Sequence, residues 1–178
     1  LTDPDFTGHT ELIAGICGQT HYTMMLASKA LTVTHVSTHV SMEQSIRNCK
    51  KERILEVIRL TWDALTRFQE HPVIAVAGLN PHAGENGAFG DQELTDIAPA
   101  VQAAREEGMD VVGPLPPDTV FLRAYRGEFG AVVCMYHDQG HIPMKLLDFE
   151  GGVNVSLGLK VVRTSVDHGT AYDIAYQG

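Results

Sequence analysis

Three histidines in the chain each follow a run of residues typical of a β-strand, and histidine is the commonest metal ligand in proteins. They are His39 after residues 31–38, His82 after residues 72–77, and His137 after residues 131–136. Ligands of open α/β sheets bind at strand ends, so we expect these imidazoles to converge at one sheet edge. Three neutral imidazoles with an open position are typical of a catalytic zinc-type site. Their separations are too long for a local ligand signature, so solvated or hydrogen-bonded loop histidines remain the alternative interpretation.

Two aspartates and a fourth histidine could assist such a site. Asp138, next to His137, could accept a hydrogen bond from a metal-bound ring, which usually donates its other N–H to an acceptor. The alternative role of Asp138 is a helix N-cap. Asp118 follows two prolines and is either a helix cap or a catalytic group. His141 could at most support a metal-binding histidine without binding the metal itself. No role is predicted for His21, His35 and His71.

A second group of polar residues could bind an anion. Lys145, Asn154 and Arg163 lie in or beside strand-like segments rather than in a run of charge. A lysine or arginine with apolar neighbours suits either a surface side chain with a buried stem or an anion ligand. His9 and Thr10 stand at the predicted start of a helix, which offers free backbone N–H groups. Together these five residues could form a phosphate pocket.

The composition is that of an ordinary soluble globular protein. The 178 residues are 44% hydrophobic and 20% charged, enough for one domain with a sizeable core. A formal net charge of −9 without a basic run argues against nucleic-acid and membrane partners. The three cysteines are widely spaced with no CxxC, which indicates a reducing compartment. No signal peptide or transmembrane run is present, so we expect a cytoplasmic protein.

Runs typical of strands and helices alternate along the chain, which predicts the α/β class. Helices are expected at residues 11–16, 42–49, 54–68, 94–106, 119–125 and 141–147. Strands are expected at residues 22–27 and 31–36, joined as a hairpin, and at 72–77, 110–113, 131–136, 153–157 and 160–163. There is no Walker, GxSxG, HExxH or GxGxxG motif, so any dinucleotide is bound without the standard fingerprint.

Seven motifs together resemble the 4-hydroxythreonine-4-phosphate dehydrogenase family of pyridoxal-phosphate biosynthesis. They are GHTE at 8–11, STH at 37–39, GLNPHAGENG at 78–87, GPLPPDT at 113–119, MYHDQG at 135–140, GVNVSLG at 152–158 and RTSVDHGTA at 163–171. The motifs run the length of the chain in family order, which leaves little room for chance. The resemblance implies the fold of isocitrate and isopropylmalate dehydrogenases, here as a three-layer α/β domain with a mixed sheet.

The resemblance also implies a homodimer that uses NAD or NADP and a divalent metal such as zinc, magnesium or cobalt. The active site would lie at the dimer interface, in a cleft between two domains. The implied metal ligands, contributed jointly by both subunits, are His39, His82 and His137. The implied substrate contacts are His9, Thr10, Lys145, Asn154 and Arg163. Residues 168–175 resemble the adenosine-binding HGxAxDIA loop of isocitrate-type relatives, which implies cofactor contacts at His168, Gly169 and Asp173.

Two features depart from the family pattern. Family members have a region before residue 8 and a helical tail after the last motif, and these build another domain. Residues 1–178 are therefore expected to be a single domain, the metal- and substrate-binding half of a two-domain enzyme, and inactive in isolation. Residues 38–41 and 140–145 look closer to a sister branch acting on 4-phospho-D-threonate or 4-phospho-D-erythronate. Other relatives oxidise aromatic cis-dihydrodiols.

The implied reaction is oxidation of a secondary alcohol of a phosphorylated four-carbon hydroxy acid. With 4-phosphohydroxy-L-threonine, decarboxylation would follow. A base must remove the hydroxyl proton, and Lys145 and Asp118 are both candidates, acting directly or through water. Two rival interpretations are a non-catalytic metal-binding or dimerisation fragment and a metal-dependent hydrolase that uses the same histidines. The missing zincin motifs and the loop at residues 168–175 count against the hydrolase.

Overall fold

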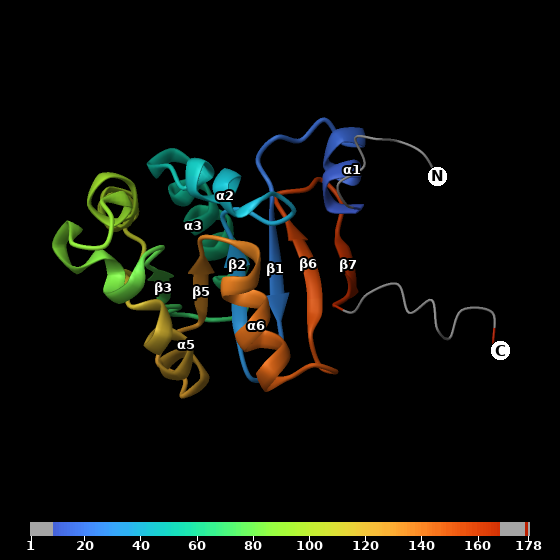
Figure 1. Ribbon diagram of the computed structural model, residues 1–178. Helices are drawn as coiled ribbons and strands as arrows, with labels where there is room; N and C mark the ends of the chain where they lie inside the picture. The colour runs from blue at the N-terminus through green and yellow to red at the C-terminus, as the bar shows by residue number, and fades with distance from the viewer. Residues whose placement is uncertain (1–8, 168–176, 178) are drawn as a thin grey trace.

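Short apolar runs of the chain form one seven-stranded sheet with helices on both faces (Figure 1). The computed structural model describes residues 9–167 and residue 177. The strands are β1 (Thr23–Ala27), β2 (Thr32–His35), β3 (Ile74–Ala77), β4 (Val111–Leu115), β5 (Ala131–Cys134), β6 (Val153–Leu157) and β7 (Arg163–Val166). The helices are α1 (His9–Ile16), α2 (Met42–Asn48), α3 (Lys51–Leu65), α4 (Ala98–Glu106), α5 (Pro117–Tyr125) and α6 (His137–Leu147). Two shorter helical segments are η1 (Pro81–Gly87) and η2 (Glu93–Ile97).

The sheet is mixed, with strand order β4-β3-β5-β2-β1-β6-β7. The four strands β4, β3, β5 and β2 are parallel. The central ones, β3 and β5, are buried along their whole length, which explains their unbroken apolar sequences. Strands β1, β6 and β7 pair antiparallel. In β6 the buried positions Asn154 and Ser156 alternate with more exposed apolar ones, so both polar side chains point to the same face.

Two apolar cores hold the helices against the sheet. On one face, residues of α3 and α4 such as Ile58 and Val101 pack on Ile74 and Val133 of the sheet. On the other face, residues of α5 and α6 join Val33 and other strand residues in the second core. Figure 1 shows α6 in front of the sheet and α3 behind it. This arrangement confirms the predicted three-layer α/β architecture.

The hairpin of β1 and β2 is confirmed, and most elements lie within a few residues of their predicted positions. The strand predicted at residues 160–163 is wrong. The last strand begins at Arg163 because Arg163 pairs with Ser156 of β6, and residues 158–162 make the connection. The helix predicted at residues 141–147 begins earlier, at His137. Asp138 lies in its first turn, where a negative charge interacts favourably with the helix dipole.

Three predictions on single residues need correction. Neither aspartate is an N-cap, because Pro116 and Tyr136 occupy the cap positions and Asp118 and Asp138 lie in the first turns. Phe68, the last residue of the helix predicted at residues 54–68, lies beyond the end of α3 and is 67% exposed. Among the described residues, no helix has the length and apolar character needed to cross a membrane.

Candidate active site

His39 and His137 lie close together at one edge of the sheet. His39 lies in the loop after β2, and His137 is the first residue of α6 after β5. The centroids of their rings are 5.7 Å apart. A hollow of about 460 Å³ lies beside both rings, within the size range of small-molecule sites. The predicted convergence therefore holds for two of the three histidines.

Each of these two rings is oriented by a carboxylate. Nδ1 of His39 donates to Oε1 of Glu11 over 3.1 Å, and Nδ1 of His137 donates to Oδ1 of Asp138 over 2.7 Å. An ionised carboxylate only accepts hydrogen bonds, so both neutral rings carry their proton on Nδ1. The Nε2 lone pair is then free to bind a metal. Asp138 has the orienting role that its position next to His137 suggested.

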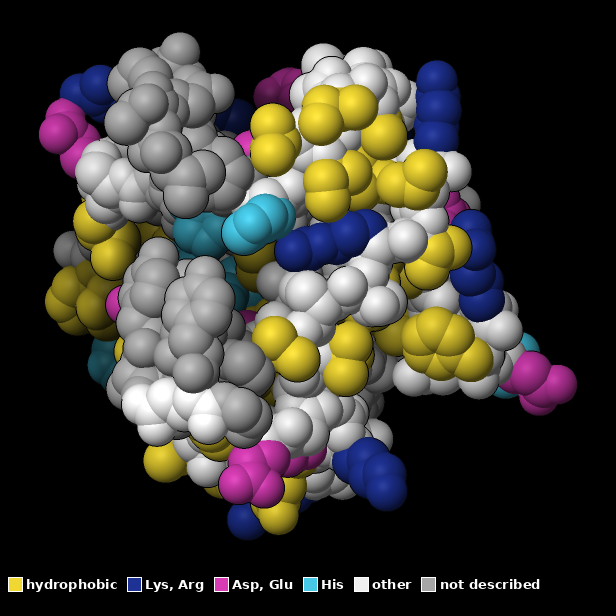
Figure 2. All heavy atoms as spheres, turned by 90° about the vertical axis from the view of Figure 1, so that its right-hand side faces the viewer, with side chains coloured by type: hydrophobic (Ala, Val, Ile, Leu, Met, Phe, Trp, Pro, Cys, Tyr) yellow, Lys and Arg dark blue, Asp and Glu magenta, His cyan; other side chains and the backbone are white. Residues whose placement is uncertain are grey.

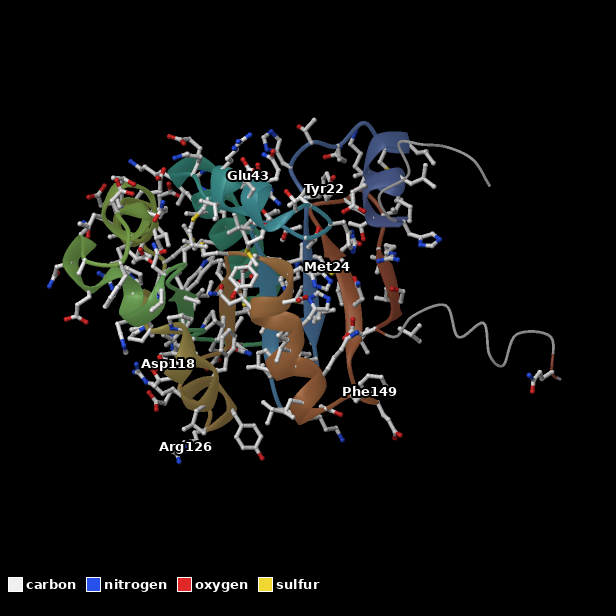
Figure 3. All side chains as sticks on the ribbon, viewed as in Figure 1. Tyr22, Met24, Glu43, Asp118, Arg126 and Phe149 are labelled. Carbon is white, nitrogen blue, oxygen red and sulfur yellow. The ribbon has the colours of Figure 1, made fainter. Side chains whose placement is uncertain are left out.

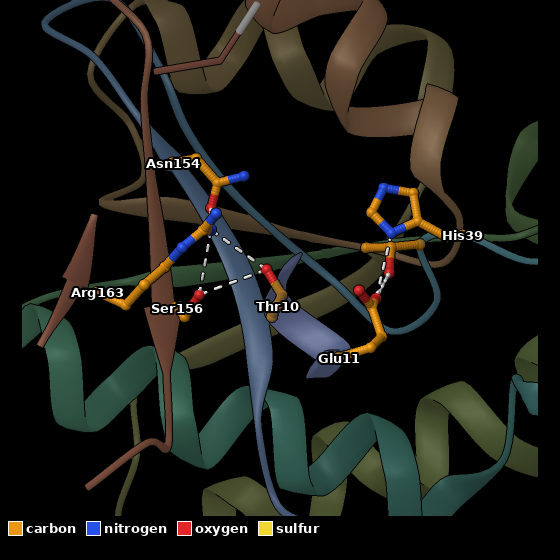
Figure 4. A network of polar contacts seen from close by, with 7 residues as sticks. Thr10, Glu11, His39, Asn154, Ser156 and Arg163 are labelled. Carbon is orange, nitrogen blue, oxygen red and sulfur yellow. Dashed lines mark hydrogen bonds and ion pairs between the residues drawn. The ribbon is translucent and has the colours of Figure 1, made fainter. Parts of the chain in front are cut away.

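Glu11 and His39 also shift each other's ionisation. The hydrogen bond from His39 lowers the pKa of Glu11, although partial burial opposes this. The same hydrogen bond raises the pKa of His39. Thr38 donates a further bond to Oε1 of Glu11 over 3.4 Å. Figure 4 shows Glu11 reaching from α1 to the His39 loop.

Two further histidines lie beneath His137. The ring of His141 stacks on that of His137 with 3.6 Å between centroids, and His35 lies 4.8 Å from His141. Burial is the main cause that lowers the pKa of His35 to about 3 and that of His141 to about 4. Both rings are therefore neutral in neutral solution. Gly140 is needed here, because a Cβ at this position would lie 2.5 Å from Nε2 of His35.

Arg163 is the centre of a polar cluster on the same side of the sheet (Figure 4). Its Nη1 donates to Oγ1 of Thr10 and Oδ1 of Asn154 over 3.2 Å, and to Oγ of Ser156 over 3.4 Å. All three acceptor residues are buried. We call these four residues the Arg163 cluster. Since its contacts to the described residues all use Nη1, the guanidinium group keeps Nη2 and Nε for an anion.

The remaining predicted substrate contacts, His9 and Lys145, lie on the helices that carry Thr10 and His137. His9 is the exposed first residue of α1, next to Thr10. Lys145 lies two turns after His137 on α6, and its charge contributes to the low pKa of His141, after burial and His137. Figure 2 shows histidine side chains gathered near the middle of the face seen from the β7 side, beside a basic side chain.

His82 and Asp118 are not part of this group. His82 is exposed in η1, and its ring lies 6.0 Å from that of Phe89. Asp118 is exposed at the start of α5, on the other side of α6 from β6 and β7 (Figure 3). Since α5 packs against η1, these two residues belong to neighbouring elements. In the described part of the chain, no three His, Cys, Asp or Glu side chains gather closely enough to hold a metal.

The loop that carries His82 has an uncommon backbone. Six consecutive residues, from His82 to Gly87, have positive φ angles, and only two of them are glycines. The loop is held by the buried carboxylate of Glu93, whose Oε1 accepts the backbone N–H groups of Leu79 and Asn80 over 2.7 Å. These hydrogen bonds stabilise the start of the loop, whose left-handed backbone is costly for residues other than glycine.

Sequence reasoning missed four residues of this site: Glu11, His35, Ser156 and Glu93. For Ser156 a signal was present, because it lies two residues after Asn154 in a strand and so on the same face. The contacts of Glu11 and His35 depend on which strands and helices become neighbours, and no local pattern indicates that. The predicted cofactor residues His168, Gly169 and Asp173 lie outside the described residues.

Comparisons with known proteins agree with this architecture. The profile of the family described as pyridoxal phosphate biosynthetic protein PdxA matches residues 2–178. D-threonate 4-phosphate dehydrogenase of Pectobacterium atrosepticum is 51% identical over 97% of this chain and 53% of its own length. 4-Hydroxythreonine-4-phosphate dehydrogenase of Geobacter metallireducens is 56% identical over 97% of this chain and 51% of its own length.

Solved structures are similar over the same region. The crystal structure of 4-hydroxythreonine-4-phosphate dehydrogenase from Klebsiella pneumoniae has a TM-score of 0.86 and 51% identity, covering 96% of this chain and 52% of that one. A terephthalate 1,2-cis-dihydrodiol dehydrogenase from Burkholderia xenovorans has a TM-score of 0.81 and 31% identity, covering 96% of this chain and 55% of that one. The chain spans about half the length of the relatives it matches. Because the family profile matches residues 2–178, the chain belongs to the PdxA family.

Proposed function

We propose that this chain carries the metal- and substrate-binding part of an NAD(P)-linked dehydrogenase. Its substrate would be a phosphorylated four-carbon hydroxy acid, oxidised at a secondary alcohol. One observation carries the proposal: the paired imidazoles of His39 and His137 and the Arg163 cluster are joined by the first turn of α1. A dehydrogenase of this kind needs both a site for the reacting oxygen and a site for the phosphate.

The Arg163 cluster is suited to bind the phosphate. Hydrogen bonds from Nη1 to three neutral acceptors fix the guanidinium plane without neutralising its charge. Two parallel N–H groups can then meet two phosphate oxygens, which is the geometry in which arginine binds this group best. Lys145 and His9 would add positive charge or donors from α6 and α1. Fixing the phosphate would orient the secondary alcohol at the other end of the substrate.

His39 and His137 would hold the divalent metal, with His82 of a second chain as the third ligand. The two free Nε2 atoms fit such an ion, and imidazole donors suit zinc or cobalt better than magnesium. When bound, the metal would act as a Lewis acid on the substrate hydroxyl, and the nicotinamide would take up the hydride.

A base must still accept the hydroxyl proton. Lys145 lies on α6, the helix that begins with His137, so it belongs to the same group of residues. Asp118 lies beside η1 and would enter the site together with His82 of the second chain. We propose Lys145 as the base within one chain and Asp118 as the alternative. Contacts of His168, Gly169 and Asp173 with the cofactor remain a prediction.

The separation of His82 and Asp118 from the other ligands supports a site shared between two subunits. Exposed apolar residues on α6 also support a partner at this place. Ile142 is 63% exposed and Leu146 is 83% exposed on the helix that carries His137 and Lys145. Apolar side chains grouped beside a polar site are typical of an interface. We propose a homodimer in which each site combines His39 and His137 of one chain with His82 of the other.

Complementation between inactive variants tests the shared site. His39→Ala and His82→Ala, made in the intact two-domain enzyme, should each abolish NAD(P) reduction with added zinc or cobalt. Mixed dimers of the two variants contain one site with all three histidines, so a 1:1 mixture should recover about a quarter of wild-type activity. If the mixture stays inactive while each variant binds its substrate, the shared site is wrong.

The names of the relatives leave two substrate classes for this family member. The same assay should therefore compare 4-phosphohydroxy-L-threonine with D-threonate 4-phosphate and D-erythronate 4-phosphate. Reduction of NAD or NADP with 4-phosphohydroxy-L-threonine alone would indicate pyridoxal phosphate synthesis. Reduction with the 4-phosphates of D-threonate or D-erythronate would indicate sugar-acid catabolism. No turnover with any of them, together with retained metal binding, would favour the non-catalytic metal-binding alternative.

A further inference from the structure

We propose that Glu11 is a positioning residue that sets the metal-binding face of His39 and links it, through α1, to the Arg163 cluster. The proposal rests on the metal site proposed above. It assigns Glu11 neither contact with substrate nor a part in proton transfer. Its role is to fix which nitrogen of His39 faces the hollow between His39 and His137.

The geometry of Glu11 supports this role. Its Oε1 receives both the Nδ1–H of His39 at 3.1 Å and the hydroxyl of Thr38 at 3.4 Å. Two consecutive residues of the His39 loop are therefore held by one carboxylate oxygen. Because that oxygen cannot donate, the neutral ring of His39 is confined to the tautomer with a proton on Nδ1. The lone pair of Nε2 is then available for a metal, as in other carboxylate–histidine–metal arrangements.

The second carboxylate oxygen argues against a purely stabilising ion pair. Oε2 of Glu11 is buried and has no hydrogen-bond partner among the described residues. A buried acceptor without a partner lowers stability. The hydrogen bonds that this carboxylate accepts from other side chains come from two consecutive residues of the His39 loop. The position of Glu11 is therefore better explained by the orientation of His39 than by stability.

Helix α1 connects this contact to the anion site. Thr10 and Glu11 are consecutive residues of the first turn, and successive side chains of a helix point about 100° apart. Thr10 accepts from Nη1 of Arg163 on one side, and Glu11 accepts from His39 on the other (Figure 4). One rigid turn thus fixes the distance between the phosphate site and the proposed metal ligand. Such a fixed connection would help to hold the two ends of one substrate in place.

The test uses the full chain and begins without metal. Wild type, Glu11→Gln and Glu11→Ala are labelled with ¹⁵N-histidine, and the tautomer of His39 is read from long-range ¹H–¹⁵N spectra after chelator treatment. At about pH 9, where the ring is neutral, we expect the Nδ1–H tautomer alone in wild type, a mixture in Glu11→Gln, whose amide can accept or donate, and loss of the preference in Glu11→Ala. Glu43→Gln, which alters an exposed carboxylate of α2 paired with Arg47, is the matched control.

The second readout is the binding of Co²⁺, followed by its visible absorption. We expect Glu11→Ala to weaken Co²⁺ binding about 10- to 100-fold, with a smaller loss in Glu11→Gln. Glu43→Gln should stay within about twofold of wild type. An unchanged His39 tautomer in Glu11→Ala, or an equal loss of affinity in Glu43→Gln, would overturn the proposal.

The two readouts separate this proposal from the proposed function. If His39→Ala binds Co²⁺ as tightly as wild type, the metal site is wrong, but the tautomer of His39 in metal-free protein still decides whether Glu11 orients the ring. If Glu11→Ala does not fold, Glu11→Gln keeps the shape of the side chain and gives the same comparison. A wild-type spectrum with the proton of His39 on Nε2 would refute the role of Glu11 whatever the metal does.

Discussion

The buried rings of His35 and His141 should make the stability of the metal-free fold depend on pH. Burial lowers the pKa of His35 to about 3 and that of His141 to about 4, from an ordinary value of 6.5. Below about pH 6.5 the unfolded chain therefore binds protons that the folded chain does not bind. The contribution of the two buried neutral histidines to the free energy of unfolding is therefore fully present above this pH and is lost as the pH falls. Between pH 7 and pH 5, each ring should lower the free energy of unfolding by about 2 kcal/mol.

The substitution His35→Gln isolates one half of this effect. The amide does not titrate, so the variant should lose about 2 kcal/mol less unfolding free energy than wild type between pH 7 and pH 5. Carboxylates that titrate in this range are the same in both proteins and cancel in the comparison. The variant is also expected to be less stable than wild type at pH 7, because a packed buried ring is replaced.

Urea denaturation of the two proteins at both pH values, with a chelator present, measures this double difference. His71→Gln, which replaces an exposed histidine, is the control and should keep the wild-type loss. Equal losses in His35→Gln and wild type would refute the reasoning, because His35 would then not be kept neutral by burial. A larger loss in the variant would have the wrong sign for a group with a lowered pKa.

Three further substitutions test the site and its supports. Arg163→Lys keeps the charge but loses the planar fork, so KM for the phosphorylated substrate should rise about 10- to 100-fold with little change in kcat, measured by steady-state kinetics. Gly158→Ala puts a methyl group 2.2 Å from the carbonyl oxygen of His21 at a φ of +83°, and should lower the free energy of unfolding by about 1–3 kcal/mol in urea denaturation. Glu93→Ala removes the support of the His82 loop and should speed amide hydrogen exchange in residues 79–90 at least tenfold.

Each of these three predictions would be contradicted by a specific result. An unchanged KM in Arg163→Lys, or the same rise in Arg123→Lys at an exposed ion pair, would remove Arg163 from the substrate site. Gly127 also has a positive φ but nothing within 4 Å of a Cβ, so Gly127→Ala should cost less than Gly158→Ala. Unaltered exchange in Glu93→Ala would mean that the left-handed turn is stable without its carboxylate.

Much of the architecture could be predicted from the sequence because the elements are short and locally coded. Unbroken apolar runs marked β3 and β5, and Ser28 to Ala30 between two strand-like runs marked the first hairpin. The last strand could not be placed, because its start is fixed by pairing with β6 rather than by its own residues. Phe68 fits the apolar period of α3, yet the helix ends before it, so periodicity alone overestimated the buried stripe.

The site could be predicted only in part, because several of its contacts join elements that are far apart in the sequence. Residue type and position after a strand indicated His39 and His137, which do meet. His82 satisfies the same rule, but a run of positive φ angles directs its loop elsewhere, and no sequence period shows such a turn. His35 looked like an ordinary strand residue, because strand alternation cannot say which helix will cover a face. Glu11 acts over 28 residues of sequence, beyond any local pattern.

The contact between Arg163 and Thr10 has a consequence for how the protein is made. It joins residues 153 positions apart, whereas the hairpin of β1 and β2 closes locally. Synthesis at about 5–20 residues per second separates the emergence of these two residues by about 8–30 s. Long-range pairing is also the slow part of folding. A nascent chain can therefore bring His39 and His137 together before β7 exists, whereas the proposed anion site is completed only after Arg163 has been made.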